Sequence, residues 1–182
     1  MIHTSKQLKD KVRNLSKGDN DIAKALIRTF MMERFLERVS LSKYRENLIL
    51  KGGMLVASIV GTNLRATMDI DTTVKALPLN KTEAEKIVDE IAAVPVEDGV
   101  TFQIKSITTI MDDFDYPGVR IMLEAILEKL RQSIKLDIST DDVMAQMWER
   151  FRKKNYFVGE LQWEEVSGKV IQNIQEIVVE KS

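Results

Sequence analysis

The sequence lacks several residue types on which common functional sites depend. It contains no cysteine, which excludes disulfide bonds and thiolate metal sites. Its only histidine is His3, beside the start, so neither a Ser-His-Asp triad nor a histidine-rich zinc site is expected. No apolar run is long enough to span a membrane, and the first residues are polar, unlike a signal peptide. The expected location is therefore the cytoplasm, with no membrane partner.

What the sequence does contain is typical of a globular protein. Its 182 residues suit one domain, or one domain with a small appendage, and apolar residues make up 44% of them. The net charge of −1 gives the whole molecule no strong attraction for nucleic acid. Residues 6–17 are locally basic, and a solvated tail or helix face explains such a run more often than a nucleic-acid contact does.

Periodic apolar residues predict where the helices and strands lie. A helix is expected over residues 19–40, with its N-cap among residues 19–21. A second helix is expected over residues 80–94, where Thr82 and Glu85 form a capping box. The strands are predicted at residues 47–53, 65–75, 100–110, 120–127 and 133–139, with a short helix at 54–60 and a turn-rich loop at 112–119.

The order of these elements predicts an α+β fold, with a mixed sheet flanked by helices. Residues 1–140 are expected to form this α+β domain. Helical periodicity returns in residues 141–154 and 163–181. We expect residues 141–182 to be C-terminal helices packed on the domain, although their apolar stripes could also form a dimer contact.

Three aspartates are the strongest candidates for a functional site. Asp69 and Asp71 are two residues apart on a predicted strand, so their side chains project from the same side. Asp137 lies on a later strand and also faces away from the apolar side. Gathering like charges is unfavourable unless a cation compensates, and carboxylate oxygens suit a hard ion such as Mg²⁺. If the two strands are neighbours, the carboxylates should cluster within reach of one or two metal ions.

A double glycine before the aspartates adds a possible phosphate site. Gly52 and Gly53 can turn sharply and let the backbone approach a ligand, and a helix beginning there directs free N–H groups at the turn. We expect these glycines on the opposite side of the same cleft from the carboxylates. Arg65 and Thr67 can supplement the cradle. Each feature alone has an ordinary structural explanation, as a turn or a solvated charge, but the combination favours a nucleotide and metal site.

These motifs together resemble a known family. The stretch "ERFLERVSLSKYRENLILKGGMLVASIVGTNLRATMDID" is similar to AbiEii/AbiGii-type toxins of type IV toxin–antitoxin and abortive-infection systems, which have the nucleotidyltransferase fold. The similarity runs from about Leu26 to Thr140. It implies that Gly52 and Gly53 hold a triphosphate. It also implies that three aspartates form the acidic site: Asp69 and Asp71 bind magnesium, and Asp137 completes the carboxylate set. Lys135 should face the same site.

The chain departs from the family pattern after the third acidic strand. Relatives continue with an Ala-Glu-Lys-Leu stretch and an Arg-Asp-x-Tyr-Asp stretch, and neither follows Asp137 here. The similar "AEKI" at Ala84–Ile87 lies upstream, on a predicted helix, so we expect Lys86 to be a surface residue. The pattern indicates a family member shortened by an internal deletion near Thr140 and Asp141.

Two functions from different classes follow from the resemblance. The first is a metal-dependent enzyme that uses Mg²⁺ or Mn²⁺ to transfer a nucleoside monophosphate from a nucleoside triphosphate to tRNA or another RNA, with Asp137 as the candidate general base. The second is a catalytically weakened module that binds a nucleotide or a cognate antitoxin. A structural remnant that does neither is a third possibility. Loss of the family lysine favours the second function, and the intact glycines and aspartates favour the first.

Overall fold

The computed structural model describes residues 2–55, 69–111, 117–140, 148, 151–154, 159–160 and 165. The chain divides into two compact units, Met1–Ser139 and Thr140–Ser182. In the second unit, residues 151–154 are helical as predicted, and the rings of Trp148 and Phe151 stack with their centroids 5.7 Å apart. The other parts of the two predicted C-terminal helices lie almost entirely outside the described residues, so their packing stays a prediction.

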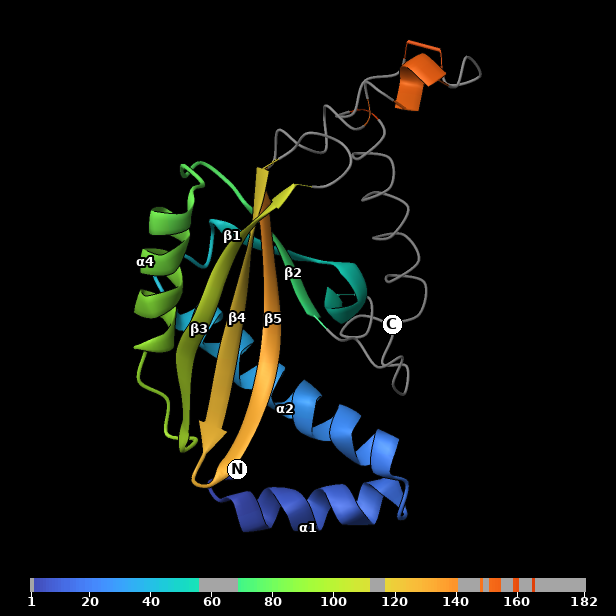
Figure 1. Ribbon diagram of the computed structural model, residues 1–182, viewed down its shortest axis with the longest axis vertical. Helices are drawn as coiled ribbons and strands as arrows, with labels where there is room; N and C mark the ends of the chain where they lie inside the picture. The colour runs from blue at the N-terminus through green and yellow to red at the C-terminus, as the bar shows by residue number, and fades with distance from the viewer. Residues whose placement is uncertain are drawn as a thin grey trace. The chain divides into compact units, whose positions relative to one another are not determined.

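The first unit is an α+β fold built on a five-stranded sheet (Figure 1), which confirms the predicted fold class. Its described elements are α1 (Ser5–Ser16), α2 (Asn20–Leu41), β1 (Leu48–Lys51), β2 (Asp69–Val74), α4 (Lys81–Ala92), β3 (Val100–Met111), β4 (Pro117–Leu127) and β5 (Leu130–Thr140). The strand order is β1-β2-β5-β4-β3. Strands β1 and β2 are antiparallel, as are β3 and β4, and β4 and β5. The order places β5 next to β2, although a helix and two strands separate them in the sequence.

One face of the sheet is buried, and the described side chains of β4 and β5 on the other face are partly or fully exposed. Ile134, Leu136 and Ile138 of β5 share the buried face, as predicted from their alternation, with at most 2% of each residue exposed. Figure 1 shows α2 passing behind the sheet and α4 alongside β3, so the helices cover the far face. The remaining side chains of β4 and β5, which include charged ones, face the open side.

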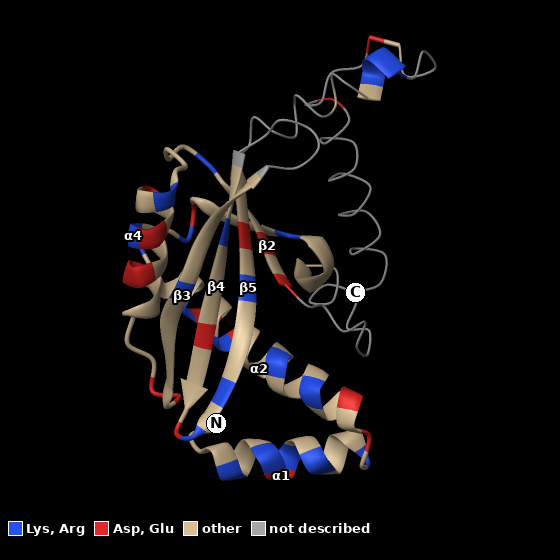
Figure 2. Ribbon diagram, viewed as in Figure 1, with Lys and Arg blue, Asp and Glu red and all other residues tan. Residues whose placement is uncertain are grey.

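Helix α1 carries the basic residues of the N-terminal segment. It begins with a capping box in which the Thr4 hydroxyl accepts a hydrogen bond from the backbone N–H of Gln7, whose side chain bonds back to the cap backbone. Leu8 and Val12 are buried against the core, while the basic side chains are exposed along the helix (Figure 2). The segment is therefore a solvent-exposed helix face rather than a tail.

The two predicted helix caps have different outcomes. Asp19 caps α2, because its carboxylate accepts hydrogen bonds from the N–H groups of Asp21 and Ile22. The capping box predicted for α4 is wrong: Asn80 is the N-cap, and its side chain accepts from the N–H of Glu83. Asparagine caps helices at least as well as threonine does, so the cap lies two residues before the expected one and the helix begins at Lys81.

Three strand predictions also need correction. Strand β1 was expected to be buried, but it forms an edge of the sheet, and 44% of Ile49 is exposed. The strand expected from residue 120 begins at Pro117, inside the predicted loop, whose residues 112–116 lie outside the described part. The strand expected at residues 133–139 begins earlier, at Leu130. Residues 69–74 of the strand expected at residues 65–75 form β2, as predicted, and residues 65–68 lie outside the described part. Among the described residues, no helix is long and apolar enough to cross a membrane.

A buried ion pair joins α2 to the start of β3. The Arg38 guanidinium donates to both carboxylate oxygens of Asp98, at 2.8 and 2.9 Å, and to the carbonyl of Val100 at 2.7 Å. Asp98 also accepts from the N–H of Val100 at 2.9 Å. Arg38 is 2% exposed and Asp98 is fully buried, so the pair is sealed from water.

Candidate active site

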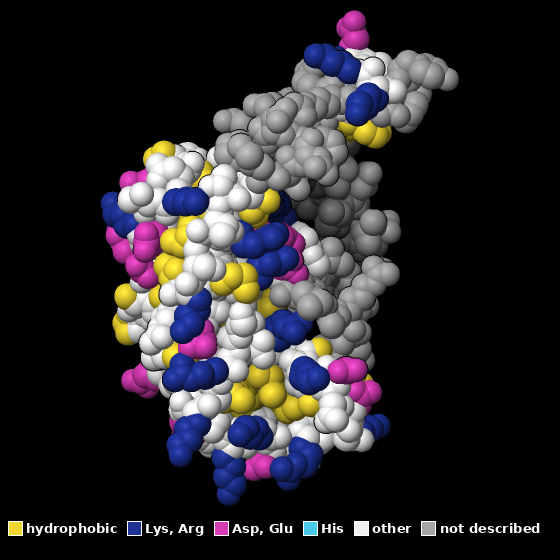
Figure 3. Space-filling view, in the orientation of Figure 1, with side chains coloured by type: hydrophobic (Ala, Val, Ile, Leu, Met, Phe, Trp, Pro, Cys, Tyr) yellow, Lys and Arg dark blue, Asp and Glu magenta, His cyan; other side chains and the backbone are white. Residues whose placement is uncertain are grey.

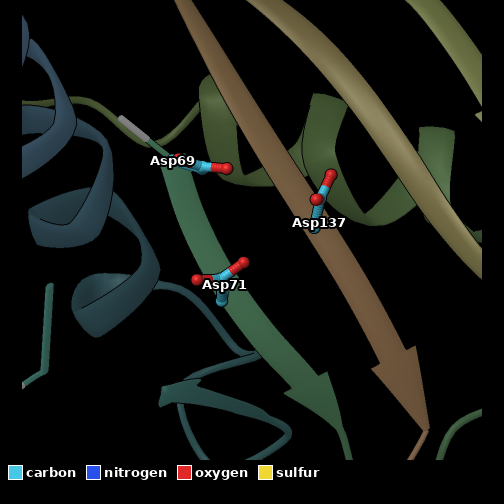
Figure 4. Close-up of side chains that lie close together, drawn as sticks. All are labelled: Asp69, Asp71 and Asp137. Carbon is cyan, nitrogen blue, oxygen red and sulfur yellow. The ribbon is translucent and has the colours of Figure 1, made fainter. Parts of the chain in front are cut away.

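Three carboxylates meet on the open face of the sheet. Asp69 and Asp71 extend from β2, and Asp137 extends from the neighbouring β5 (Figure 4). Each offers one oxygen atom such that all three lie within 4.8 Å of one another. The predicted convergence of the three carboxylates is therefore confirmed, and we call this group the acidic triad.

Strand pairing and burial fix the direction of these side chains. Figure 4 shows β2 and β5 running in the same direction, which makes the sheet mixed, as predicted. The Thr72 hydroxyl donates to the carbonyl of Asp137 at 3.2 Å across the two strands. Ile70 and Leu136, which alternate with the triad, are buried on the opposite face. A slip of one residue in either strand would exchange these faces, so core packing holds the carboxylates outward.

Lys135 places a positive charge among the carboxylates. Its ammonium forms an ion pair with Asp69, and its Nζ lies 3.9 Å from Oδ2 of Asp137. The prediction that Lys135 faces this site is confirmed. Because the ammonium contacts carboxylates from both strands, it occupies a position that suits a cation.

Arg120 was missed by the sequence analysis. It lies on β4 directly opposite Asp137, and its guanidinium donates Nε–H to Oδ1 at 2.8 Å and an Nη2 hydrogen to Oδ2 at 2.7 Å. The signal was present in the hairpin, since a two-residue turn pairs Leu127 with Leu130. Counting outward from that turn pairs residue 120 with residue 137.

The surroundings of Asp71 disfavour its charged form. Burial raises its pKa above the usual range, and the negative charges of Asp69 and Asp137 raise it further. The positive charges of Lys51 and Lys135 oppose this rise. Lys51 lies opposite Asp71 on β1, and its ammonium donates to the hydroxyl of Ser139 at 2.6 Å.

The backbone of Gly52 lies directly against the acidic triad. Its φ of +69° is in the left-handed region that favours glycine. A Cβ at this position would lie 2.3 Å from Oδ2 of Asp71, so no other residue fits without displacing the carboxylate. Gly52 was predicted on the opposite side of a cleft from the carboxylates. It lies instead directly against one of them, Asp71. Gly53 follows it, exposed, within the helical residues 52–55.

Two predicted site residues, Arg65 and Thr67, lie outside the described residues. On the face seen in Figure 3, acidic and basic side chains lie against one another. Figure 2 shows the same charges along the strands, with acidic positions on β2 and β5 and basic positions on β4 and β5.

The residues of the triad fit a hard divalent cation. Three carboxylates from two rigid strands match the oxygen ligands that Mg²⁺ and Mn²⁺ prefer. The Lys135 ammonium already stands among them as a cation. Two oxygens on one Mg²⁺ lie at most about 4.2 Å apart, twice the usual ligand distance, so a spacing within 4.8 Å requires only a small closure.

The chain has limited similarity to individual known proteins. No curated protein matches. Two solved structures from Helicobacter pylori are similar: JHP933, with 21% identity and a TM-score of 0.41, and a nucleotidyltransferase candidate, with 23% identity and a TM-score of 0.39. Both alignments cover 65% of this chain, which spans only 44% and 46% of those chains.

The family comparison covers the acidic triad and most of the sheet. The family model described as "Nucleotidyl transferase AbiEii toxin, Type IV TA system" matches residues 34–160, a range that starts later and ends later than the resemblance noted in the sequence. This match includes Gly52, Gly53 and all three aspartates. The chain therefore belongs to the AbiEii nucleotidyl transferase toxin family of type IV toxin–antitoxin systems.

Proposed function

We propose that this protein is a metal-dependent nucleotidyltransferase that moves a nucleoside monophosphate from a nucleoside triphosphate to an RNA acceptor, with the 3′ end of tRNA as the expected target. The observation that supports this most directly is the acidic triad, with the backbone of Gly52 close to the Asp71 carboxylate. The chain also belongs to the AbiEii family. The triad supplies hard oxygen ligands, and the adjacent glycine allows the backbone to approach a phosphate.

The proposed roles follow from the position of each group. Asp69, Asp71 and Asp137 would hold Mg²⁺ or Mn²⁺. One or two such ions supply charge neutralisation and stabilise the attacking and leaving oxygens of an in-line displacement. Gly52 and Gly53 would hold the triphosphate through their backbone, supplemented by Arg65 and Thr67 from the segment between β1 and β2.

The transfer itself would replace a phosphoanhydride bond of the triphosphate with a phosphodiester bond to the acceptor. A hydroxyl oxygen of the acceptor bonds to the α-phosphorus, the bond from that phosphorus to the bridging oxygen breaks, and pyrophosphate leaves. Asp137 would accept the proton of the attacking hydroxyl. Lys135 would pair with the negative charge that develops on the phosphoryl oxygens, because its ammonium already lies between carboxylates of both strands.

The family also suggests where the protein acts and what controls it. Type IV toxin–antitoxin systems pair a toxin with a cognate antitoxin, so we propose that such a partner limits this activity. Nucleoside triphosphates and tRNA are cytoplasmic, which makes the cytoplasm the proposed location.

The test is transfer of labelled nucleotide to total RNA with Mg²⁺, alongside equilibrium binding of the triphosphate. Asp69→Ala and Asp71→Ala should each weaken Mg²⁺-dependent triphosphate binding by at least about 10–100-fold, the loss typical of disturbing even the groups around a metal site. Glu124→Ala is the matched control, because Glu124 is acidic and on the same strand as Arg120 but pairs with Lys105 and Arg131. If all three variants bind like the parent, the nucleotide site is elsewhere.

A second candidate function is nucleotide binding with little transfer. It is favoured by the contacts that Arg120 and Lys135 already make with the triad, and by the absence of the family lysine downstream of Asp137. Losing a preorganised electrostatic donor slows catalysis by roughly 10²–10³-fold, while ground-state binding survives. Triphosphate binding that depends on the triad, without label in any RNA, would select this second function.

A further inference from the structure

The acidic triad is matched by an equal number of cations from the same sheet. Lys51 on β1, Arg120 on β4 and Lys135 on β5 surround it. Arg120 and Lys135 contact the carboxylates directly, and Lys51 acts on Asp71 through its charge. Among the residues that the structure describes, formal charges of −3 and +3 therefore cancel around the triad, which distinguishes it from a cluster of bare carboxylates.

We propose that Arg120 and Lys135 are built-in counter-cations of the triad, which a divalent ion must displace. The ion then binds weakly by itself and tightly only together with a triphosphate, whose negative charge accepts the released cations. This inference rests on the proposed function, because it assumes that the triad holds the metal. It assigns Arg120 a role in setting the affinity of the site for the ion.

The contact geometry of Arg120 supports competition. Its guanidinium donates to both oxygens of Asp137, so an ion approaching this carboxylate meets a positive charge bonded to it. The Arg120 side chain is 39% exposed, and the Asp137 side chain is 19% exposed. The guanidinium can therefore turn toward solvent without breaking the core. A guanidinium also matches phosphate oxygens with the same forked geometry that it uses for a carboxylate.

Lys135 opposes a free ion for the same reason. Its ammonium pairs with Asp69 and lies near Asp137, between the two strands that carry the triad. A divalent ion held by these carboxylates would repel the ammonium at close range. The Lys135 side chain is 30% exposed and long enough to move to a phosphate oxygen instead. Triphosphate binding therefore relieves the repulsion that the free ion experiences.

The experiment measures Mn²⁺ binding to the full chain, by the electron paramagnetic resonance signal of free Mn²⁺, with and without a non-hydrolysable triphosphate analogue. After correction for the Mn²⁺ that the analogue binds in a protein-free titration, the analogue should tighten Mn²⁺ binding to the parent by at least about tenfold. Arg120→Gln should tighten binding of Mn²⁺ alone by about tenfold, since a nearby like charge is removed. In Arg120→Gln, the analogue should also tighten Mn²⁺ binding less than it does in the parent.

The variants separate competition from a purely structural role. If Arg120 only held Asp137 in place, Arg120→Gln would loosen the carboxylate and weaken Mn²⁺ binding, which would overturn the proposal. Arg120→Lys keeps the charge without the fork and should bind free Mn²⁺ nearly as the parent does. Lys135→Gln should also tighten the binding of Mn²⁺ alone. It is the test variant if Arg120→Gln does not fold. Arg131→Gln, whose partner is Glu124, should change nothing.

The outcomes also separate this inference from the proposed function. Absence of Mn²⁺ binding in every variant, with and without the analogue, would overturn both. Coupled binding of Mn²⁺ and analogue without transfer to RNA would support the inference and overturn the enzyme function. Tight binding of Mn²⁺ to the parent without the analogue would overturn the inference and leave the enzyme function standing.

Discussion

Two arginine–aspartate pairs in this protein have nearly the same contacts and opposite surroundings. Arg38 bonds Asp98 at 2.8 and 2.9 Å, and Arg120 bonds Asp137 at 2.8 and 2.7 Å. The side chains of the first pair are 3% and 0% exposed, while those of the second are 39% and 19% exposed. The length of the hydrogen bonds therefore does not indicate what each pair does.

The neighbours of each pair explain the difference. Around Arg38, the carbonyls of Arg34 and Val100 accept further hydrogen bonds, and the ring of Phe102 lies 5.0 Å from the guanidinium. The partner of Arg120, Asp137, belongs to the acidic triad, and the ammonium of Lys135 lies 3.9 Å from the same carboxylate. The further hydrogen bonds of the buried pair are with fixed backbone groups, and among the described residues the Nε of Arg38 has no hydrogen-bond partner. The exposed pair lies among charges that can exchange partners, which suits a site that takes up a ligand.

Removing the arginine of each pair should give the largest contrast. Arg38→Ala leaves Asp98 charged and buried without its partner, so we expect a loss of about 3–5 kcal/mol in the free energy of unfolding. Arg120→Ala affects a partly exposed pair and should lower the free energy of unfolding by no more than about 1 kcal/mol. Urea denaturation of both variants in metal-free buffer is the measurement. If both variants lost the same free energy of unfolding, the different exposure of the two pairs would have no effect on stability.

Gly52→Ala should come next in size, because it strains the backbone and also disturbs the acidic triad. A Cβ in the left-handed conformation costs about 1–2 kcal/mol, and here it would also collide with the Asp71 carboxylate. Gly18→Ala is the control, since Gly18 has a φ of +90° and no atom within 4 Å of the added Cβ. Gly52→Ala should therefore lose more stability than Gly18→Ala and should also weaken Mn²⁺ binding with the analogue. Equal losses and unchanged binding would show that the close approach has no consequence.

Neutralising single aspartates of the triad should change stability in opposite directions. The pKa of Asp71 is raised, so its charged form is disfavoured by folding, and Asp71→Asn should raise the melting temperature in metal-free buffer at pH 7. Asp137→Asn removes the charged partner of Arg120 and should lower it. Each change should be a few degrees at most, because 1 kcal/mol corresponds to roughly 2–4 °C in a protein of this size. A fall of similar size in both variants would contradict this difference.

The smallest effect concerns pH and the buried pair. Burial tends to raise the pKa of Asp98, but hydrogen bonds from Arg38 and from the N–H of Val100, together with the charge of Arg38, lower it below the usual value. A lowered carboxyl pKa contributes stability above the unfolded value of about 3.9, and this stability is lost as the pH falls through the folded value.

The measurement is the free energy of unfolding of the parent between pH 6 and the acid limit of folding, compared with an Arg38→Met/Asp98→Leu double variant. The decline with falling pH should be shallower in the double variant, because its unfolded state no longer takes up a proton at residue 98. Parallel curves would show that the pair does not contribute to acid sensitivity. Arg120→Gln is a useful third curve, since the buried pair remains intact in that variant.

Much of the candidate site could be predicted from local pattern. The spacing of Asp69 and Asp71 predicted that their side chains project from the same side of a strand. The alternation of apolar residues in β5 predicted that Asp137 and Lys135 face away from the core. Arg120 could also have been found, because the short turn between β4 and β5 fixes the register of the hairpin. The failed cap of α4 has a local cause too, since Asn80 offers an acceptor before Thr82 and the helix begins at the earlier cap.

By itself, the sequence determined the α+β class, the faces of the strands and the family motifs, because an alternation of two residues fixes which side chains share a face. Only the tertiary structure decided that β5 lies beside β2, because strand neighbours depend on pairing between distant segments. That pairing brings Asp137 to Asp69 and Asp71, and it brings Lys135 and Arg120 with it. The close approach of Gly52 to Asp71 is likewise set by the pairing of β1 with β2. The charge balance of the site thus arises from the order of the strands, which no local pattern contains.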